Sequence, residues 1–287
     1  MEKMEKPELI AMLNTDLADE HAAIIRYLVH SYIEGEDTPI GAKLLSRSRE
    51  EMWHMHWLGM IIGDLGGEPI MTPAAYPFDP SSRKTIFQSY VAYEEKLIPH
   101  YRSEAEKVSD PHIKRVLFRE AWESAVHAEK FQKMHDKLSP EDARELPGAE
   151  NELPEPFVEA LQKLVETKYN QMLQSLRDAW TFKKSGAAAW QIMDFSYTKM
   201  KQLAHMAEEV SENGFDPRLA TPGTIRHAEI GRALKAALES VHNTKAQHAA
   251  IRDDPEAAKH GGLTTNLNLA IKQETYEAEE LADWLKQ

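Results

Sequence analysis

The sequence predicts an all-α protein built from two four-helix bundles in tandem. Three observations support this fold class. The length of 287 residues suits two domains of ordinary size. Glycine and proline are concentrated in a few segments, and between these segments apolar residues recur at helical spacing. A proline-rich acidic segment at residues 139–156 has the composition of a linker, so we expect domains at 1–138 and 157–287.

The first half carries the pattern of four helices. An apolar stripe through Leu13 and Leu17 marks the first helix, and two adjacent glycines end the second. Prolines within residues 73–80 indicate a crossover before the third helix. Asp110 before Pro111 combines an N-cap residue with a proline suited to the first helical turn. The expected helices cover residues 7–35, 40–65, 82–108 and 111–138.

Helical periodicity returns after the linker, and the last helix is expected to start at a cap formed by Thr264 or Thr265. The helices expected in this half cover residues 157–184, 188–213, 224–252 and 264–287. Several residues in and around the turns of the two halves match at separations of 144 to 151 positions. They are His54 with His205 inside a helix, and Pro69 with Pro217 and Asp110 with Asp254 in turns. These matches predict an internal duplication, and generic turn chemistry shared by two bundles is the alternative.

Composition narrows the classes of function. The 47 Asp and Glu residues exceed the 34 Lys and Arg residues, which gives a net charge of −13 and argues against nucleic acid and anionic membranes as partners. We expect no targeting peptide and no membrane span, because the longest uncharged apolar stretch, residues 52–63, is too short. A cytoplasmic protein is therefore expected.

Cysteine is absent from the chain. This absence excludes disulfides, thiolate zinc sites, cysteine-ligated iron–sulfur centres and cysteine nucleophiles. Carboxylates and the 13 histidines are the side chains left to bind a metal ion.

Candidate ligands recur along the predicted helices of the first half. Glu51 and His54 are three residues apart, so both can reach one metal ion from a single helix face. Carboxylates from four helices with a histidine on two of them make up the set that a dinuclear iron or manganese centre uses. The candidates are Glu20, Glu51, His54, Glu94, Glu120, Glu123 and His127.

These residues and their surroundings resemble a known family. Residues 19–30, 50–54 and 65–69 are similar to the first two helices of ferritin-like proteins of the bacterioferritin and rubrerythrin type, and the resemblance covers roughly residues 8–135. It implies a ferritin-like fold for both bundles and a centre that oxidises ferrous iron or reduces oxygen or peroxide. The implied roles are a terminal ligand, a bridging ligand, a nitrogen ligand, a third-helix ligand and a catalytic tyrosine near the metals: Glu20, Glu51, His54, Glu94 and Tyr27, respectively.

The fourth helix departs from the family, which repeats Glu-x-x-His there. Three residues before His127 the chain has Ser124. Either Glu123 and His127 bind together at a spacing of four, or Glu120 contributes, or the second bridging acid is missing. A set without that acid resembles manganese catalase, so the choice between two iron ions and manganese stays open.

Two further positions concern other cofactors. Met52 aligns with the haem-ligating methionine of bacterioferritin, but a methionine at a helix contact explains it as well, and we do not expect haem. In the second half, Gln202 stands at the position matched to Glu51, and His205 at that matched to His54. Loss of the bridging carboxylate predicts a degenerate second bundle without a dinuclear centre.

The expected function is a non-haem di-iron oxidoreductase with ferroxidase activity or with peroxide- or oxygen-reducing activity. Manganese-dependent peroxide disproportionation, oxygenation of an organic substrate and a structural metal-binding role are the alternatives. Without a cysteine-ligated rubredoxin centre, electrons must come from an external donor. The expected partners are therefore metal ions, O2 or peroxide, and that donor; a homodimer is left open.

Overall fold

The computed structural model describes residues 4–140, 153–219 and 223–286, and its described residues form helices and no strands. The predicted linker at 139–156 lies largely outside them. The α-helices are α1 (Lys6–Glu34), α2 (Pro39–Asp64), α3 (Arg83–Lys107), α4 (Pro111–Asp136), α5 (Glu155–Thr181), α6 (Ala187–Glu212), α7 (Ile230–Arg252) and α8 (Gly261–Trp284). Two short 3₁₀ segments, Lys183–Ser185 and Ala257–Lys259, precede α6 and α8.

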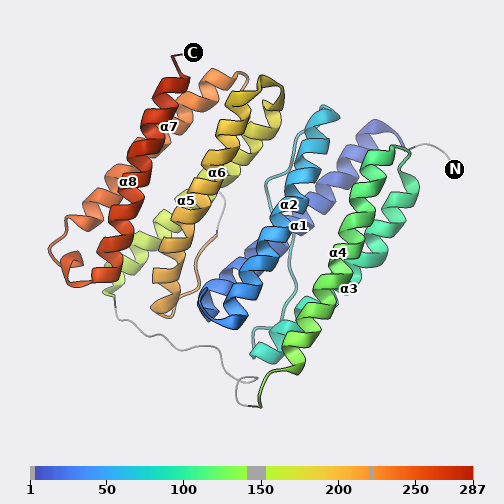
Figure 1. The fold of residues 1–287 in the computed structure, drawn as a ribbon, viewed down its shortest axis with the longest axis horizontal. Helices are drawn as coiled ribbons and strands as arrows, with labels where there is room; N and C mark the ends of the chain where they lie inside the picture. The colour runs from blue at the N-terminus through green and yellow to red at the C-terminus, as the bar shows by residue number, and fades with distance from the viewer. Residues whose placement is uncertain (1–3, 141–152, 220–222, 287) are drawn as a thin grey trace. The chain divides into compact units, whose positions relative to one another are not determined.

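The chain divides into two compact units, Met1–Pro147 and Gly148–Gln287, with four of these α-helices in each. In the first unit α1 packs along α2 and α3 along α4; in the second α5 packs along α6 and α7 along α8 (Figure 1). The prediction of an all-α protein with two four-helix bundles is thus confirmed. No helix within the described ranges is long and apolar enough to cross a membrane.

Short polar signals set the helix ends in the first unit. The Thr38 side chain accepts the Gly41 N–H at the start of α2, Ser82 and Thr85 form a capping box at α3, and Asp110 accepts the first N–H groups of α4. Gly41 lies so close to the end of α1 that a Cβ atom would meet the carbonyl oxygen of Gly35 at 1.9 Å. A side chain at residue 41 would therefore push α1 and α2 apart.

An amide side chain anchors the crossover of each unit. Asn14 donates to the carbonyl of Glu68 at 3.0 Å and accepts the N–H of Ile70 at 2.8 Å. In the second unit Gln162 makes the same two bonds, to Asp216 and Arg218, at 2.9 Å each. Residues 14, 68 and 70 thus correspond to residues 162, 216 and 218, at a constant separation of 148 positions. This repeated bond pattern supports the predicted duplication.

Two expectations for the second unit are wrong. The helix predicted from residue 224 begins at Ile230. The predicted cap at Thr264 or Thr265 is also wrong, because α8 already begins at Gly261. The Thr264 hydroxyl instead donates to the carbonyl of His260, and that of Thr265 to the carbonyl of Gly261, a bond that a helical threonine can make without ending the helix.

Candidate metal centre

Acidic and histidine side chains from all four helices meet inside the first unit. α1 supplies one carboxylate, α2 a carboxylate and a histidine, α3 a carboxylate, and α4 a carboxylate and a histidine. Every one of these side chains is at most 2% exposed: Glu20, Glu51, His54, Glu94, Glu120 and His127. Burying so many ionisable groups is costly unless cations or hydrogen bonds compensate for their lost hydration.

The first of two ligand groups consists of Glu20, Glu51 and His54. The Nδ1 atom of His54 lies 2.8 Å from Glu51 Oε2 and 3.2 Å from Glu20 Oε2. The spacing of three along α2 puts Glu51 and His54 on the same face, and α1 brings Glu20 to them. One cation could contact all three side chains.

The second group consists of Glu51, Glu94 and His127. His127 Nδ1 lies 2.7 Å from Glu51 Oε1 and 3.5 Å from Glu94 Oε1. Glu51 therefore offers one oxygen to each histidine and belongs to both groups. The two histidine rings stack nearly parallel, with their centroids 6.2 Å apart. A carboxylate shared by two adjacent nitrogen ligands is the arrangement that a bridged pair of metal ions needs.

The contact between Glu51 and His127 tests whether a metal fits. Glu51 Oε1 and His127 Nδ1 are buried and 2.7 Å apart, yet neither atom makes a hydrogen bond of acceptable geometry. Once His127 releases its proton, its Nδ1 atom and the Glu51 oxygen are two converging, buried donor atoms suited to a common cation. The donor set of the chain therefore fits a metal pair.

The two acidic candidates of the fourth helix differ. Glu120 is fully buried, and neither of its carboxylate oxygens has a hydrogen-bond partner. Glu123 lies at the edge, where it contacts His54 Nε2 on one side and Arg119 Nε at 2.9 Å on the other. The predicted ligand Glu123 is therefore outside both ligand groups. Glu123 lies four positions before His127 on α4. It contacts the Nε2 atom of His54, whereas Glu20 and Glu51 lie beside the Nδ1 atom of that ring.

Side chains outside the two ligand groups form hydrogen bonds to the buried candidate ligands. The Tyr27 hydroxyl donates to Glu94 Oε1 at 2.6 Å, and the Tyr101 hydroxyl donates to Glu20. Glu50 bonds His127 Nε2 at 2.7 Å, as Glu123 bonds the Nε2 of His54. Each histidine thus has one nitrogen toward the centre and the other on a carboxylate, which orients the ring. The roles of Tyr101 and Glu50 were not predicted, because only tertiary packing brings α3 to Glu20 of α1, and α2 to His127 of α4.

The burial and crowding of these acids shift their pKa values. Burial raises the pKa of Glu20 to about 8, and the Glu51 carboxylate adds to the increase. Burial and the nearby Glu20 hold the pKa of Glu120 well above its usual range. Burial also acts on Glu51, but His127 and His54 outweigh it and bring the pKa of Glu51 well below normal. Without cations, the centre must therefore retain protons on some of its acids.

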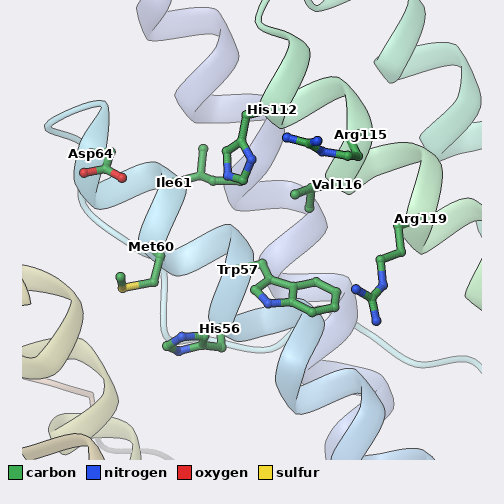
Figure 2. A pocket seen from close by; sticks show the side chains of 9 residues that line it. All are labelled: His56, Trp57, Met60, Ile61, Asp64, His112, Arg115, Val116 and Arg119. Atoms are coloured by element: carbon green, nitrogen blue, oxygen red, sulfur yellow. The ribbon is translucent and has the colours of Figure 1, made fainter. Parts of the chain in front are cut away.

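A pocket of about 420 Å³ opens beside the centre, between α2 and α4 (Figure 2). The Arg119 guanidinium stacks on the Trp57 ring there, 4.3 Å from its centroid, and also binds Glu123. Its lining contains more basic than acidic side chains: His56, Asp64, His112, Arg115 and Arg119 are its polar residues. The chain of contacts from Arg119 through Glu123 to His54 links this pocket to the buried ligands.

A comparison with known protein families matches residues 10–139 to the ferritin-like domain. The first unit therefore belongs to the ferritin-like superfamily. The match includes every residue of the two ligand groups and the whole of α1 to α4 apart from the first turn of α1. No curated protein and no solved structure matches the chain significantly.

The second bundle has a different core at the positions that correspond to the candidate ligands of the ferritin-like domain. With the separation of 148 positions given by the crossover bonds, Glu20 corresponds to Lys168 and Glu51 to Lys199. Both lysines are at most 2% exposed. Lys168 binds Glu274 and Lys199 binds Glu277, and both of these acids come from α8.

The expected match of His54 with His205 is therefore wrong by three positions. The buried residue of α6 that corresponds to His54 is Gln202, whereas the side chain of His205 is 35% exposed. Three positions are close to one helical turn, so either alignment preserves the apolar stripe, and the sequence alone did not separate them.

Proposed function

We propose that the ferritin-like domain is an oxidoreductase with a carboxylate-bridged, non-haem dinuclear iron centre. The observation that carries the proposal is the position of Glu51, which has one oxygen beside His54 and the other beside His127. Glu20 and His54 would complete one iron site, and Glu94 and His127 the other. Glu120, with two unpaired oxygens, would be a further carboxylate ligand near Glu20.

Charge balance supports two divalent ions. Four buried carboxylates, Glu20, Glu51, Glu94 and Glu120, carry four negative charges when ionised, and the two histidines are neutral when they act as ligands. Two divalent cations neutralise this set. Because burial raises the pKa of three of these acids, cation binding would displace the protons that otherwise compensate.

A bound pair of iron ions would supply the electrons that reduce O2 or peroxide, in ferroxidase or peroxide-reducing chemistry. The protein would contribute orientation and exclusion of water. Glu50 and Glu123 fix the histidine rings, and the Tyr27 hydroxyl holds Glu94. Tyr27 would thus act as a positioning residue that donates a hydrogen bond to Glu94. Since the chain has no cysteine-ligated centre, an external donor would return the electrons.

Metal analysis of the full chain tests this proposal, with Glu51→Gln as the decisive variant. We expect about two irons per wild-type chain after anaerobic loading, with consumption of O2 or peroxide and a ferric absorption band on oxidation. Glu51→Gln removes the shared charge and should abolish the activity and lower the iron content. Glu95→Gln, an exposed neighbour of Glu94 on α3, is the matched control and should behave as wild type.

Three outcomes would contradict the proposal. Tight binding of manganese with catalase activity, and no oxidation of iron, would favour the manganese alternative. Turnover only with an added organic compound would favour an oxygenase. Less than a tenth of an equivalent of any transition metal after reconstitution would exclude all of these functions.

A further inference from the structure

A second cluster of metal-binding side chains lies in the same unit, outside the proposed dinuclear centre. Asp16 belongs to α1, and His100 and Glu104 belong to α3. His100 Nε2 lies 3.0 Å from Asp16 Oδ1 and 3.4 Å from Glu104 Oε1. One ligand atom from each residue lies within 4.8 Å of the other two, which is close enough for a single cation to touch all three.

The cluster contains buried oxygens that lack partners. Asp16 is 0% exposed, and its Oδ2 atom makes no hydrogen bond. Glu104 is 7% exposed, and its Oε2 atom is likewise buried and without a hydrogen-bond partner. A buried carboxylate oxygen without a partner loses its hydration with no compensation, so it is a place where a proton or a cation is needed.

We propose that Asp16, His100 and Glu104 form a separate binding site for one divalent transition-metal cation. Two carboxylates and one imidazole provide two negative charges and three ligand atoms, which balance one divalent ion and leave coordination positions for water. Imidazole with carboxylates suits iron, manganese, cobalt or zinc, whereas magnesium and calcium prefer oxygen ligands alone.

The state of the acids without a cation agrees with this assignment. Burial raises the pKa of Glu104 to about 8, and the neighbouring Asp16 contributes to that increase. Burial also raises the pKa of Asp16, although the hydrogen bond from His100 opposes it. Burial thus disfavours the charged form of both acids, and a divalent ion is a partner that would compensate it.

The position of the site distinguishes it from the dinuclear centre. Asp16 lies one helical turn before Glu20 on α1, and His100 directly precedes Tyr101, which bonds Glu20. The His100 side chain is 35% exposed, whereas every ligand of the proposed centre is buried. A cation here can exchange with solvent, so we expect weaker and faster binding than at the centre.

Cobalt(II) binding to the full chain, counted by equilibrium dialysis, tests this site. His100→Gln and Glu104→Gln should each weaken one cobalt site by at least about tenfold, so that one equivalent is lost at limiting cobalt. Glu106→Gln, at an exposed position two residues further along α3, is the matched control and should keep all equivalents. Circular dichroism confirms folding, and if Glu104→Gln is unfolded, the half-exposed His100→Gln decides the test.

The inference is separable from the proposed function by combining variants. Glu51→Gln should remove cobalt from the dinuclear centre only, and adding His100→Gln should remove one further equivalent. If Glu51→Gln has no effect but His100→Gln still loses one equivalent, the separate site stands and the dinuclear centre is wrong. If His100→Gln and folded Glu104→Gln bind as much cobalt as Glu106→Gln does, the separate site is refuted.

Discussion

Glu51 is the residue that joins the two ligand groups of the candidate metal centre. Its two oxygens face two histidines from different helices, and its pKa is well below normal because His127 and His54 outweigh the effect of burial. Glutamine at this position would keep the shape but supply one oxygen and no charge. No other residue of the described chain belongs to two of the three candidate metal-ligand groups.

Tyr27 permits a sharper test at the same scale. Tyr27→Phe removes the hydrogen bond to Glu94 and leaves the ring in its aromatic contacts with Tyr90 and Phe131. Loss of a hydrogen-bond partner that orients a metal ligand typically lowers metal affinity or activity by about tenfold to a hundredfold. We therefore expect the iron affinity or the turnover of Tyr27→Phe to fall by that factor. Anaerobic titration with ferrous iron and initial rates of O2 consumption measure the two effects.

Tyr90→Phe is the control for this prediction. Tyr90 is as deeply buried as Tyr27, but its hydroxyl bonds His30 and no candidate ligand. It should cost folding stability of about 1 kcal/mol with little change in iron affinity. Equal effects of the two variants on affinity would show that Tyr27 acts through packing and not through Glu94.

Whole helices of the two units correspond, but the chemistry of their inner faces is reversed. α1 and α2 carry Glu20 and Glu51, whereas α5 and α6 carry Lys168 and Lys199 at the same positions. The acids of the second unit come from α8 and pair with these ammonium groups. The second core therefore contains its own positive charges, and the first depends on cations or protons.

The Lys199–Glu277 pair allows a test of this reversal. Lys199→Met leaves Glu277 buried without its counter-charge, which should destabilise the second unit by about 3–5 kcal/mol. The double variant Lys199→Met with Glu277→Leu should recover most of that loss, since both charges are removed together. Urea unfolding measures the free energies.

The matched control is the exposed pair Lys259 and Glu256, whose contact lies on the surface. Lys259→Met should cost less than about 1 kcal/mol, as exposed ion pairs do. A small loss for Lys199→Met, or a double variant no more stable than the single one, would mean that Lys199 does not compensate a buried charge on Glu277.

The two units together predict an unequal response of the molecule to metals. A cation that binds only the folded first unit stabilises it by about 4 kcal/mol at a thousandfold excess over the dissociation constant. Added manganese(II) should therefore raise the unfolding temperature of one transition by several degrees and leave a second transition unchanged. A chelator should reverse the shift.

Calorimetry of the full chain, with and without manganese, checks this prediction. The Glu51→Gln variant should lose most of the metal-dependent shift and keep only the part that comes from the separate site, and Lys199→Met should lower only the metal-independent transition. A shift of both transitions by manganese would show that the second unit also binds the ion.

The helices, the all-α class and most candidate ligands follow from the sequence because apolar periodicity and capping residues act over a few neighbouring positions. Glu20, Glu51, His54, Glu94 and His127 were identified from the spacing of acids and histidines on the predicted helices and from the resemblance to ferritin-like proteins, and the structure brings them together. Glu123 was assigned to the ligands on spacing alone, and it lies instead on the outer nitrogen of His54.

Contacts between helices required the three-dimensional arrangement. A shift of one turn along a helix leaves its apolar stripe almost unchanged, so the sequence alone paired His205 with His54 and did not reveal the buried lysines. Asp16 and His100 are 84 positions apart, and no local pattern joins them. Which side chain meets which across a bundle depends on how helices distant in sequence pack, and a periodicity confined to one helix contains no information about its neighbour.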